Sequence, residues 1–547
     1  MASFSHEFIA RFKMTADIQK EALTGISSQV ENAELPDQRG QNAPPPPTND
    51  TSPWDSIKNN PKAMASCCYM LFTCIMWGYD GLASAVVLSI PRWRQDYGNL
   101  YNGAYVVPAQ WQLAFTAASM IGLVLGGIAA GWVSKQYGQR ICIVGGHVTT
   151  IAGACLQWYS IGDLGMFFAG KLLTGIPLGV FVTVAPVYCS EVAPQDLRGA
   201  MVAAVNFSIV VGQVLAYGVM RQSQSIDGPL AYRTLFAVQW GFAAVGLLLV
   251  YFVPESPTRL AARGKYDAAK DSIRFLYPST TSVDEMLERI TLNLSHVSSL
   301  EAAGSFKQCF NRANAMRTVV ALSVFFIQAC SGVSWILGYM GYFMQLSGMQ
   351  GTEVFDTSLG ITGVMAVGNI LSWPLIDRLG RRRLILSGLT FCTVCLLLIG
   401  VLGCFSDKSR PITLAQVSFM AIWGFMYQVS IGSVGYTLVA EVATTSLRGH
   451  TQSLSTVVNG LSNCIWSFAL PYMVNPDEAN MGGKVAFIFF GILVVSDVFV
   501  YFFYPETKGR SFEEIDELYA RGIPAWRFAD TTLEPQFYQG SVDKATA

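Results

Sequence analysis

Charge is scarce in this chain. Asp, Glu, Lys and Arg together make up 13% of its 547 residues, about half the share that a soluble domain carries. Hydrophobic residues make up 52%, and this balance excludes an ordinary soluble protein. The formal net charge of −1 lacks the basic excess that a nucleic-acid partner would need, so we expect no such partner.

Residue sets typical of catalysis are missing as well. The twelve cysteines lie almost entirely in apolar segments and show neither metal-site spacing nor a disulfide framework. The sequence contains no nucleophile–base set, phosphate loop or metal cluster, so we expect no enzyme activity, metal or cofactor. The first 50 residues are polar, which predicts no cleavable signal peptide. We expect the first apolar span to direct the chain to the membrane instead.

Long hydrophobic runs are abundant. Twelve apolar spans recur along the chain, and each is long enough to cross a bilayer. We place them at residues 63–90, 109–133, 141–160, 164–188, 200–220, 235–253, 318–345, 355–376, 384–405, 411–439, 450–474 and 484–504. The pattern predicts an all-α membrane protein with twelve transmembrane helices.

Polar segments divide the chain. The first segment includes four consecutive prolines and is typical of a disordered tail, whereas the central one contains amphipathic stretches typical of surface helices. We therefore predict a cytoplasmic tail (1–62), a six-helix bundle (63–253), a cytoplasmic linker (254–317), a second six-helix bundle (318–504) and a cytoplasmic C-terminal tail (505–547).

Lys and Arg gather in alternate loops. Arg378, Arg381, Arg382 and Arg383 follow the eighth span, and the central linker carries nine further cations. The loops between them are poorer in positive charge and mixed in sign. Because short cytoplasmic loops carry the excess of Lys and Arg, we place both termini and the linker in the cytoplasm.

The two halves repeat. Three short motifs recur in the same order, and they pair Lys135 with Asp377, Glu191 with Glu441, and Glu255 with Glu506. The offsets are 242, 250 and 251 residues, which indicates a duplicated six-helix unit. Parallel six-helix repeats are a transporter architecture in which substrate binds near the midplane between the halves.

One stretch carries a family resemblance. Between Lys171 and Arg198, the residues Gly175, Gly179, Tyr188, Glu191 and Arg198 match the signature of the sugar porters of the major facilitator superfamily. The chain resembles these porters from about residue 63 to 528. Within them it is similar to the fungal α-glucoside (maltose permease-type) branch, on the strength of residues 170–177, 338–343, 470–476 and 505–516. The resemblance implies the major facilitator fold, alternating access and a sugar substrate.

The sequence departs from the family pattern in two places. Lys135 stands where the family usually has Asp, and Gln136 stands where it usually has a cation, which questions the charge pairing of this loop. In the tenth span, Ser433 and Gly435 stand where many sugar porters have Pro, so we expect a softer bend there.

Asp80 is a carboxylate inside the first span. Twelve residues separate it from Arg92, about 18 Å along a helix, which predicts a position near mid-membrane. Intramembrane acids are costly and tend to face a partner or a polar cavity. The resemblance implies Lys171 as that partner, because proton-coupled sugar porters carry an acid and a cation at these two positions. The pair is then either a proton-coupling site or a static ion pair that holds two spans together.

Polar side chains inside the other spans are candidates for sugar binding, because sugar hydroxyls need hydrogen-bond partners. The resemblance adds that Ala329 and Ser334 replace larger polar residues, which leaves space for a disaccharide. The alternative role for each candidate is hydrogen bonding between helices. The candidates are Asn206, Gln213, Gln328, Ser334, Tyr339, Tyr436, Asn459 and Asn463.

Charged residues also recur where spans are expected to end at the cytoplasm. We interpret them as an ion-pair gate that closes the cytoplasmic side in the outward-open state, although positive-inside topology alone explains the arginines. The gate residues are Glu191, Arg198, Asp377, Arg381, Glu441 and Arg448.

The sequence thus predicts a secondary active transporter of the plasma membrane that works as a monomer. We expect proton-coupled uptake of an α-glucoside, another disaccharide or a hexose, with sugar, protons and the lipid bilayer as its partners. A facilitative carrier, an exporter of another polyhydroxylated or secondary metabolite, and a non-transporting sugar sensor stay as alternatives. The tail after Phe512 is short for a sensor.

Overall fold

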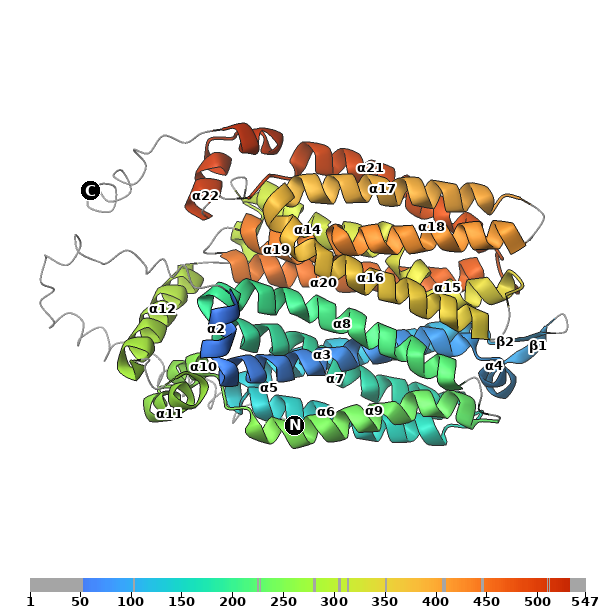
Figure 1. Cartoon of the computed structure of the whole chain (residues 1–547), viewed down its shortest axis with the longest axis horizontal. Coiled ribbons are helices and arrows are strands. Elements are labelled where there is room, and N and C mark those ends of the chain that lie inside the picture. The colour runs from blue at the N-terminus through green and yellow to red at the C-terminus, as the bar shows by residue number, and fades with distance from the viewer. Residues whose placement is uncertain are drawn as a thin grey trace, which may run out of the picture. The chain divides into compact units, whose positions relative to one another are not determined.

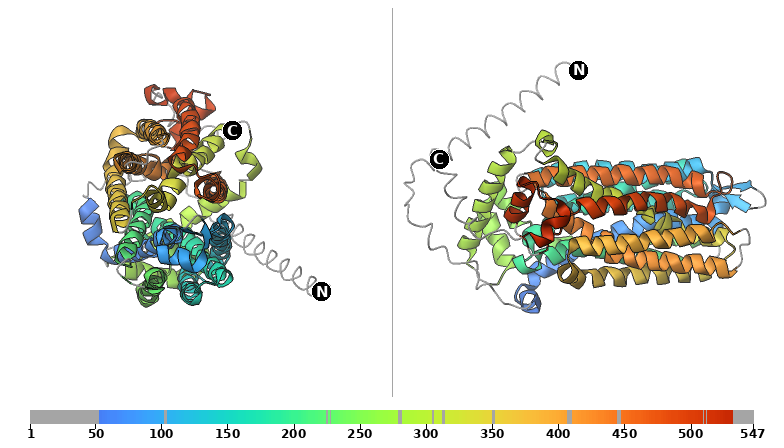
Figure 2. Two further views of the ribbon diagram at one scale, coloured as in Figure 1. Left: turned by 90° about the vertical axis from the view of Figure 1, so that its right-hand side faces the viewer. Right: turned by 90° about the horizontal axis from the view of Figure 1, so that it is seen from above.

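A computed structural model describes residues 53–531, apart from short gaps at 102–103, 224–225, 227, 279–281, 304–305, 312–313, 350–351, 406–409, 444–446, 509 and 511. The chain divides into the units Met1–Trp54 and Asp55–Ala547. In the second unit the long helices run side by side (Figures 1 and 2). Within the described residues, ten helices are long and apolar enough to cross a membrane. The prediction of a largely helical protein with long apolar helices is therefore confirmed for the described residues.

Among its described residues, the first half contains six long helices. Its elements are α2 (Pro53–Asn59), α3 (Pro61–Val86), η1 (Val87–Ser89), α4 (Pro91–Tyr97), β1 (Asn99–Tyr101), β2 (Ala104–Val106), α5 (Ala109–Gln136), α6 (Gln139–Tyr159), α7 (Leu164–Val192), α8 (Gln195–Ser223), α9 (Leu230–Leu249) and η2 (Val250–Phe252). Helix α7 packs against α5 and α6, and α3 packs against α8. Glycines allow these close contacts, since a Cβ at Gly126 would lie 1.9 Å from the Ile176 carbonyl oxygen.

The second half repeats this pattern after a polar connection. The connection contains α10 (Pro257–Ala262), α11 (Tyr266–Leu276), α12 (Val283–Ala303) and α13 (Phe306–Cys309). The second half contains α14 (Ala315–Gln328), the π-helical η3 (Ala329–Val333), α15 (Ser334–Leu346), α16 (Thr352–Leu379), α17 (Arg381–Leu402), α18 (Arg410–Val429), α19 (Ile431–Val442), α20 (Arg448–Val474), η5 (Gly482–Val485) and α21 (Ala486–Phe503), followed by α22 (Phe512–Ala520) and η6 (Ala525–Asp530). Helix α18 packs against α16 and α17, and α14 packs against α19 and α20.

Two spans of the second half are broken. Between α14 and α15 the helix passes through η3, where Gly332 has a φ of 95°, a left-handed conformation that glycine adopts without penalty. Between α18 and α19 the break falls at Ser430, with φ −110° and ψ −109°. We expected a softer bend in the tenth span for want of proline, and the structure instead interrupts the helix. Broken helices expose backbone groups that regular helices keep paired.

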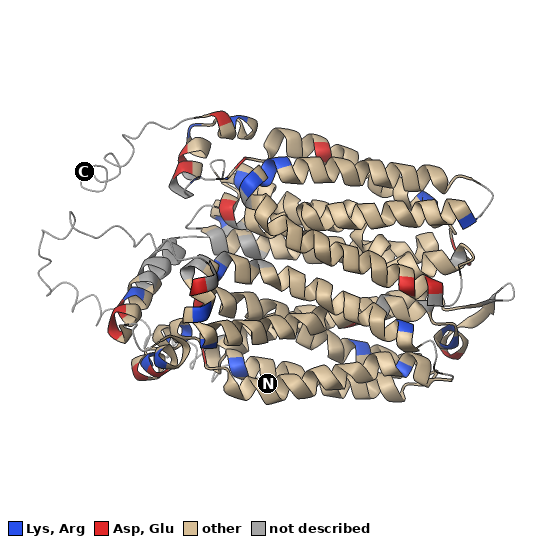
Figure 3. Ribbon diagram, in the orientation of Figure 1, with Lys and Arg blue, Asp and Glu red and all other residues tan. Residues whose placement is uncertain are grey.

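The two ends of the helix bundle differ. One end carries α4 and the antiparallel β1–β2 hairpin, in which Leu100 faces Tyr105, and we call it the hairpin end. The other carries α10–α12 and α22, and we call it the linker end (Figure 1). Lys, Arg, Asp and Glu are concentrated at the two ends, above all at the linker end, whereas the ribbon between them is largely free of charge (Figure 3).

A matching pair of carboxylates caps one helix in each half. Glu255 accepts a hydrogen bond from the backbone N–H of Gln139 at 2.7 Å, where α6 begins. Glu506 accepts one from the backbone N–H of Arg381 at 2.9 Å, where α17 begins. The residue before each helix is a glycine with positive φ, 127° at Gly138 and 88° at Gly380. Because carboxylates stabilise the exposed N–H groups of a helix N-terminus, both halves use the same local device.

Candidate functional site

Asp80 and Lys171 form an ion pair inside the first half. The Lys171 Nζ lies 3.1 Å from the Asp80 Oδ1, and both side chains have no exposed surface. Asp80 comes from α3 and Lys171 from α7, so the pair joins two helices that also pack against each other. The two side chains lie as close together as the resemblance implies, while their role in proton coupling stays a prediction.

Gln239 is a third member that the sequence analysis missed. Its Nε2 donates to the same Asp80 Oδ1 at 2.6 Å, and its side chain is fully buried in α9. A glutamine within an apolar span was the available signal, the same one that picked out Gln213 and Gln328. Three helices of the first half therefore meet at one carboxylate.

The surroundings of the pair are aromatic and apolar. The Lys171 ammonium lies 5.4 Å from the centre of the Phe236 ring and 6.0 Å from that of Phe167, within the range of cation–π attraction. Helix α3 ends at Val86, about 9 Å beyond Asp80. Arg92 belongs to α4, a separate helix, so the distance to Arg92 cannot be counted along one helix, and the mid-membrane position of Asp80 stays a prediction. Along α3, Asp80 lies nearer the hairpin end than the linker end.

The arrangement sets up a competition for one carboxylate. Lys171 and Gln239 both donate to Asp80, and a proton added to the carboxylate would weaken both contacts, since an ionised acceptor makes the stronger hydrogen bonds. Removing one partner of a buried ion pair leaves an uncompensated charge, which costs about 3–5 kcal/mol. If Asp80 were protonated, Lys171 would therefore have to move or to find other partners.

A second polar group lies between the halves, around the break at Ser430. Asn206 on α8 donates its Nδ2 to the Gly432 carbonyl oxygen at 3.3 Å and to Gln428 Oε1 at 3.4 Å. Gln328 at the end of α14 donates to the same Gly432 carbonyl at 3.1 Å. Asn206 and Gln328, both predicted sugar-binding residues, thus meet on one backbone oxygen from opposite halves of the chain.

Gln428 and Asn369 extend this group and were missed by the sequence analysis. Asn369 on α16 is fully buried and donates its Nδ2 to Gln428 Oε1 at 3.2 Å. Both are amides within apolar spans, so the signal was present in the sequence. What it lacked was the break at Ser430, which directs Gln428 toward α8 and α16.

A third polar group follows α15 and α20. Ser334 donates to Asn463 Oδ1 at 3.4 Å, and Asn463 donates to the Asn459 carbonyl oxygen at 2.9 Å. These three predicted residues are therefore brought together, and η3 separates Ser334 from Gln328 along the chain.

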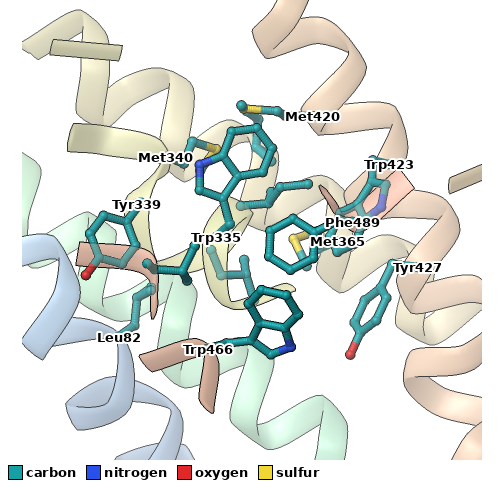
Figure 4. Packing of buried hydrophobic residues seen from close by; sticks show 14 of the residues in the cluster. Leu82, Trp335, Tyr339, Met340, Met365, Met420, Trp423, Tyr427, Trp466 and Phe489 are labelled. Carbon is teal, nitrogen blue, oxygen red and sulfur yellow. The ribbon is translucent and has the colours of Figure 1, made fainter. Parts of the chain in front are cut away.

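The other candidate sugar-binding residues lie apart from these contacts. Tyr436 on α19 keeps 40% of its surface exposed and packs edge-on against Phe325, with ring centres 5.0 Å apart. Tyr339 is buried among the hydrophobic residues of α15 (Figure 4). Gln213 is half-buried on α8.

Aromatic side chains of the second half, among them Trp335, Trp466 and Phe489, pack together (Figure 4). Phe489 lies beside the break at Gly332, where an added Cβ would be 3.4 Å from its ring. The Trp466 ring centre lies 4.5 Å from that of Phe489, and Trp335 stacks on Phe489 at 6.3 Å. The Trp466 indole N–H also contacts the Cys330 sulfur at 3.3 Å. These contacts brace η3 against α20 and α21, so the orientation of Gln328 and Ser334 on either side of η3 is fixed by packing.

Two of the predicted gate residues at the linker end, Arg381 and Glu441, form an ion pair, while Glu191 has a neutral partner. Arg381 donates to both carboxylate oxygens of Glu441, at 2.9 and 3.2 Å, and Glu191 accepts from the Gln139 side chain at 3.3 Å. Arg198 is exposed on α8. The side chains of the other two gate residues, Asp377 and Arg448, lie outside the described residues.

Arg198 lies within electrostatic reach of Tyr277. Burial raises the pKa of the Tyr277 phenol to about 12, and the positive charge of Arg198 opposes that rise. The phenol donates to the Val192 carbonyl oxygen at 2.8 Å, so the region after α11 is tied to the end of α7.

The chain is similar to known transporters along most of its length. Residues 66–519 match the family described as "Sugar (and other) transporter". A general alpha-glucoside permease of Saccharomyces cerevisiae is 31% identical over 484 residues, 87% of this chain and 78% of that protein. The MFS transporter fmqE of Aspergillus fumigatus is 29% identical over 490 residues, 87% of this chain and 90% of that protein.

Solved structures show the same fold. The xylose transporter XylE from E. coli in a partially occluded inward-open conformation has a TM-score of 0.68 at 20% identity, with 82% of this chain and 100% of that chain covered. Its inward-open conformation also gives 0.68, at 21% identity and with 83% and 99% covered. The resemblance to sugar porters is thereby confirmed, and the chain belongs to the sugar transporter family, as a multi-pass integral membrane transporter and not an enzyme.

Proposed function

We propose that this chain is a proton-coupled sugar transporter that takes up an α-glucoside, another disaccharide or a hexose by alternating access. It spans the membrane twelve times in two six-helix bundles, because α3 and α20 join the ten apolar helices. These two helices have 26 and 27 residues, about 40 Å each. Their polar residues lower their hydropathy and include Asp80, Asn459 and Asn463.

Proton coupling rests on one observation, the fully buried contact of Asp80 with Lys171 and Gln239. A buried acid inside a membrane-spanning helix is costly unless it is paired, and intramembrane acids often belong to proton relays. Competition between a proton and Lys171 for one carboxylate gives the transporter two states that differ in charge and in helix contacts. Such a two-state element is what coupling requires, since a ligand shifts an equilibrium only by its differential affinity.

A sugar substrate is supported by the amides between the halves. Asn206 belongs to the first bundle and Gln328 to the second, and both donate to the Gly432 carbonyl. A sugar hydroxyl that replaced these contacts would be held by both bundles at once. The affinity for sugar would then depend on the relative position of the two bundles. The alpha-glucoside permeases among the relatives favour an α-glucoside within this class.

The distribution of charge supports an orientation in the membrane, and the relatives support a location. The linker end carries most of the described Lys and Arg (Figure 3), so we place this end and both termini in the cytoplasm. We place the transporter in the plasma membrane, because its relatives include permeases. One chain supplies both halves of the amide group, so a monomer suffices for transport.

Uptake by whole cells tests the proposal. Yeast lacking its own α-glucoside permeases would express the full chain or Asp80→Asn, and labelled maltose, other disaccharides and hexoses would be offered with and without a proton uncoupler. We expect the uncoupler to abolish accumulation by the wild type. We expect the variant to exchange sugar across the membrane without accumulating it.

The outcomes separate the alternatives. Accumulation that survives both the uncoupler and Asp80→Asn would refute proton coupling. Uptake that only equilibrates sugar would identify a facilitative carrier, with Asp80 and Lys171 as a structural pair. Failure of every sugar in the panel, in a chain that reaches the membrane, would favour another polyhydroxylated solute or export.

A further inference from the structure

A buried polar contact joins the two halves at the hairpin end. The Gln112 Nε2 on α5 donates to the Asn475 Oδ1 at 3.0 Å and to the Val107 carbonyl oxygen at 2.8 Å. The Asn475 Nδ2 donates to the same Val107 carbonyl at 3.3 Å. Asn475 is fully buried and Gln112 is 4% exposed. We call these three residues the amide latch.

Local structure holds Asn475 in place. It follows the last residue of α20, and its backbone N–H bonds to the Pro471 carbonyl. Its own carbonyl accepts hydrogen bonds from the backbone N–H groups of Glu478 and Asn480, both at 3.2 Å. A turn anchored on both sides presents the side chain to α5 in one orientation. This segment, 470–476, is a motif that the sequence analysis noted and that the transport site does not use.

A second buried contact joins the halves toward this end, where the Tyr217 phenol on α8 donates to the Leu337 carbonyl oxygen on α15 at 3.1 Å. Two further side-chain contacts between the halves are more exposed. Arg221 and Asp356 form an ion pair at 2.6 Å, with side chains 47% and 49% exposed, and surface pairs of this kind contribute little to stability. Arg94 donates to Gln345 at 3.0 Å in a partly buried contact. The amide latch is buried on both sides, so separating it would leave polar groups without partners and would cost more.

We propose that the amide latch holds the hairpin end closed and that its opening controls access from the outer side. Because Gln112 and Val107 belong to the first half and Asn475 to the second, the latch must separate whenever the halves part at this end. The inference rests on alternating access as proposed above, and it adds the residues that set the balance between outward-open and inward-open forms. The surface pair Arg221–Asp356 adds little to that balance.

Hydrogen exchange on the purified full chain in lipid nanodiscs tests this inference without any substrate. We expect Asn475→Ala to speed amide exchange about five- to tenfold in peptides covering 104–116 and 470–480, the shift that the loss of one net hydrogen bond produces. We also expect slower exchange in linker-end peptides around 193–203, because opening one end of the transporter closes the other. Gln112→Leu removes the contact from the opposite half and should give the same result. The double variant should add little to either single change.

Asp356→Asn is the matched control, since it removes the exposed ion pair at the same end and should leave both sets of peptides unchanged. Faster exchange at the hairpin end without slower exchange at the linker end would show local loosening only and would overturn the latch. Unchanged exchange in both latch variants, or an equal response to Asp356→Asn, would overturn it as well. None of these readouts depends on proton coupling or on the identity of the sugar, so they stand apart from the uptake test.

Discussion

Gln139 and Arg381 occupy corresponding positions in the two halves, yet only Arg381 brings a charge to its partner. Each begins a helix whose first N–H groups are capped by a carboxylate, and each side chain reaches the glutamate at the end of another helix. Arg381 makes two contacts to Glu441, whereas Gln139 donates one hydrogen bond from its uncharged amide to Glu191 at 3.3 Å. The duplicated unit has therefore kept the geometry of this cluster and changed its electrostatics.

Arg381→Gln should turn the second cluster into a copy of the first. Two hydrogen bonds from a guanidinium to the Glu441 carboxylate would be replaced by one from an uncharged amide, so the ion pair and its bidentate geometry would be lost. We expect a stability loss of about 1–2 kcal/mol, measured as a lower midpoint of thermal unfolding in detergent. The neighbouring Arg383 is exposed, so Arg383→Gln is the control and should leave the midpoint unchanged. Equal effects of the two changes would show that overall positive charge matters here and the pairing with Glu441 does not.

Lys171→Met should destabilise the chain more strongly than the double change Asp80→Asn with Lys171→Met. The single variant removes the lysine while Gln239 still donates to the buried carboxylate, and breaking a buried pair costs about 3–5 kcal/mol. The double variant removes both charges and should recover most of the lost stability. Unfolding midpoints of the three proteins measure this, with Lys484→Met, at an exposed lysine, as the control.

Transport by the same double variant separates structure from coupling. If the pair couples protons, the double variant folds but does not accumulate sugar. A double variant that folds and still accumulates sugar would leave the pair with a structural role alone.

The contact between Asp80 and Lys171 could be predicted from the sequence and its family resemblance, whereas the amide group between the halves could be predicted only in part. An acid inside an apolar span indicates that a partner is needed, and the resemblance to sugar porters implied that the partner is Lys171, 91 positions along the chain. Gln428 and Asn369 could not be placed, because their contact depends on where the tenth span breaks. Serine, unlike glycine or proline, does not indicate a helix break in the sequence, so the conformation of Ser430 depends on tertiary packing.

The distance from Asp80 to the end of its helix shows a different limit of prediction from sequence. Counting residues to Arg92 assumed one continuous helix, but the chain leaves α3 at Val86 and turns through η1 into α4. Apolar character continues through residues 87–90, so hydropathy alone does not reveal the turn. Pro91, a residue that favours the first turn of a new helix, was the local sign of it.

Gln328→Ala should weaken sugar binding more than Asn206→Ala. Gln328 donates to the Gly432 and Ile431 carbonyls at 3.1 and 3.3 Å and is 8% exposed, while the contacts of Asn206 are longer, at 3.3 and 3.4 Å. Losing one hydrogen bond corresponds to a change of roughly 2- to 12-fold. We expect KM to rise toward the upper end for Gln328→Ala and the lower end for Asn206→Ala.

Initial uptake rates over a range of sugar concentrations measure both values. Gln416→Ala is a suitable comparison, because that buried amide bonds to the Ile399 carbonyl within the second half, away from Gly432. A KM change for Gln416→Ala as large as that for Gln328→Ala would show that loss of a buried amide, and not loss of a sugar contact, is being measured.

Gly126 and Gly127 should respond in opposite ways to the addition of a methyl group. A Cβ at Gly126 would lie 1.9 Å from the Ile176 carbonyl oxygen and 2.8 Å from its carbonyl carbon, so α5 and α7 would have to separate. A Cβ at Gly127 would meet the Thr183 hydroxyl at 3.7 Å, an ordinary contact, and alanine is the better helix former by about 1 kcal/mol. We expect Gly126→Ala to lower the yield of folded protein and its unfolding midpoint, and Gly127→Ala to leave both unchanged or slightly raised. Because the two residues are adjacent on one helix and the substitution is the same, equal destabilisation by both would mean that α5 and α7 do not pack through backbone contact at Gly126.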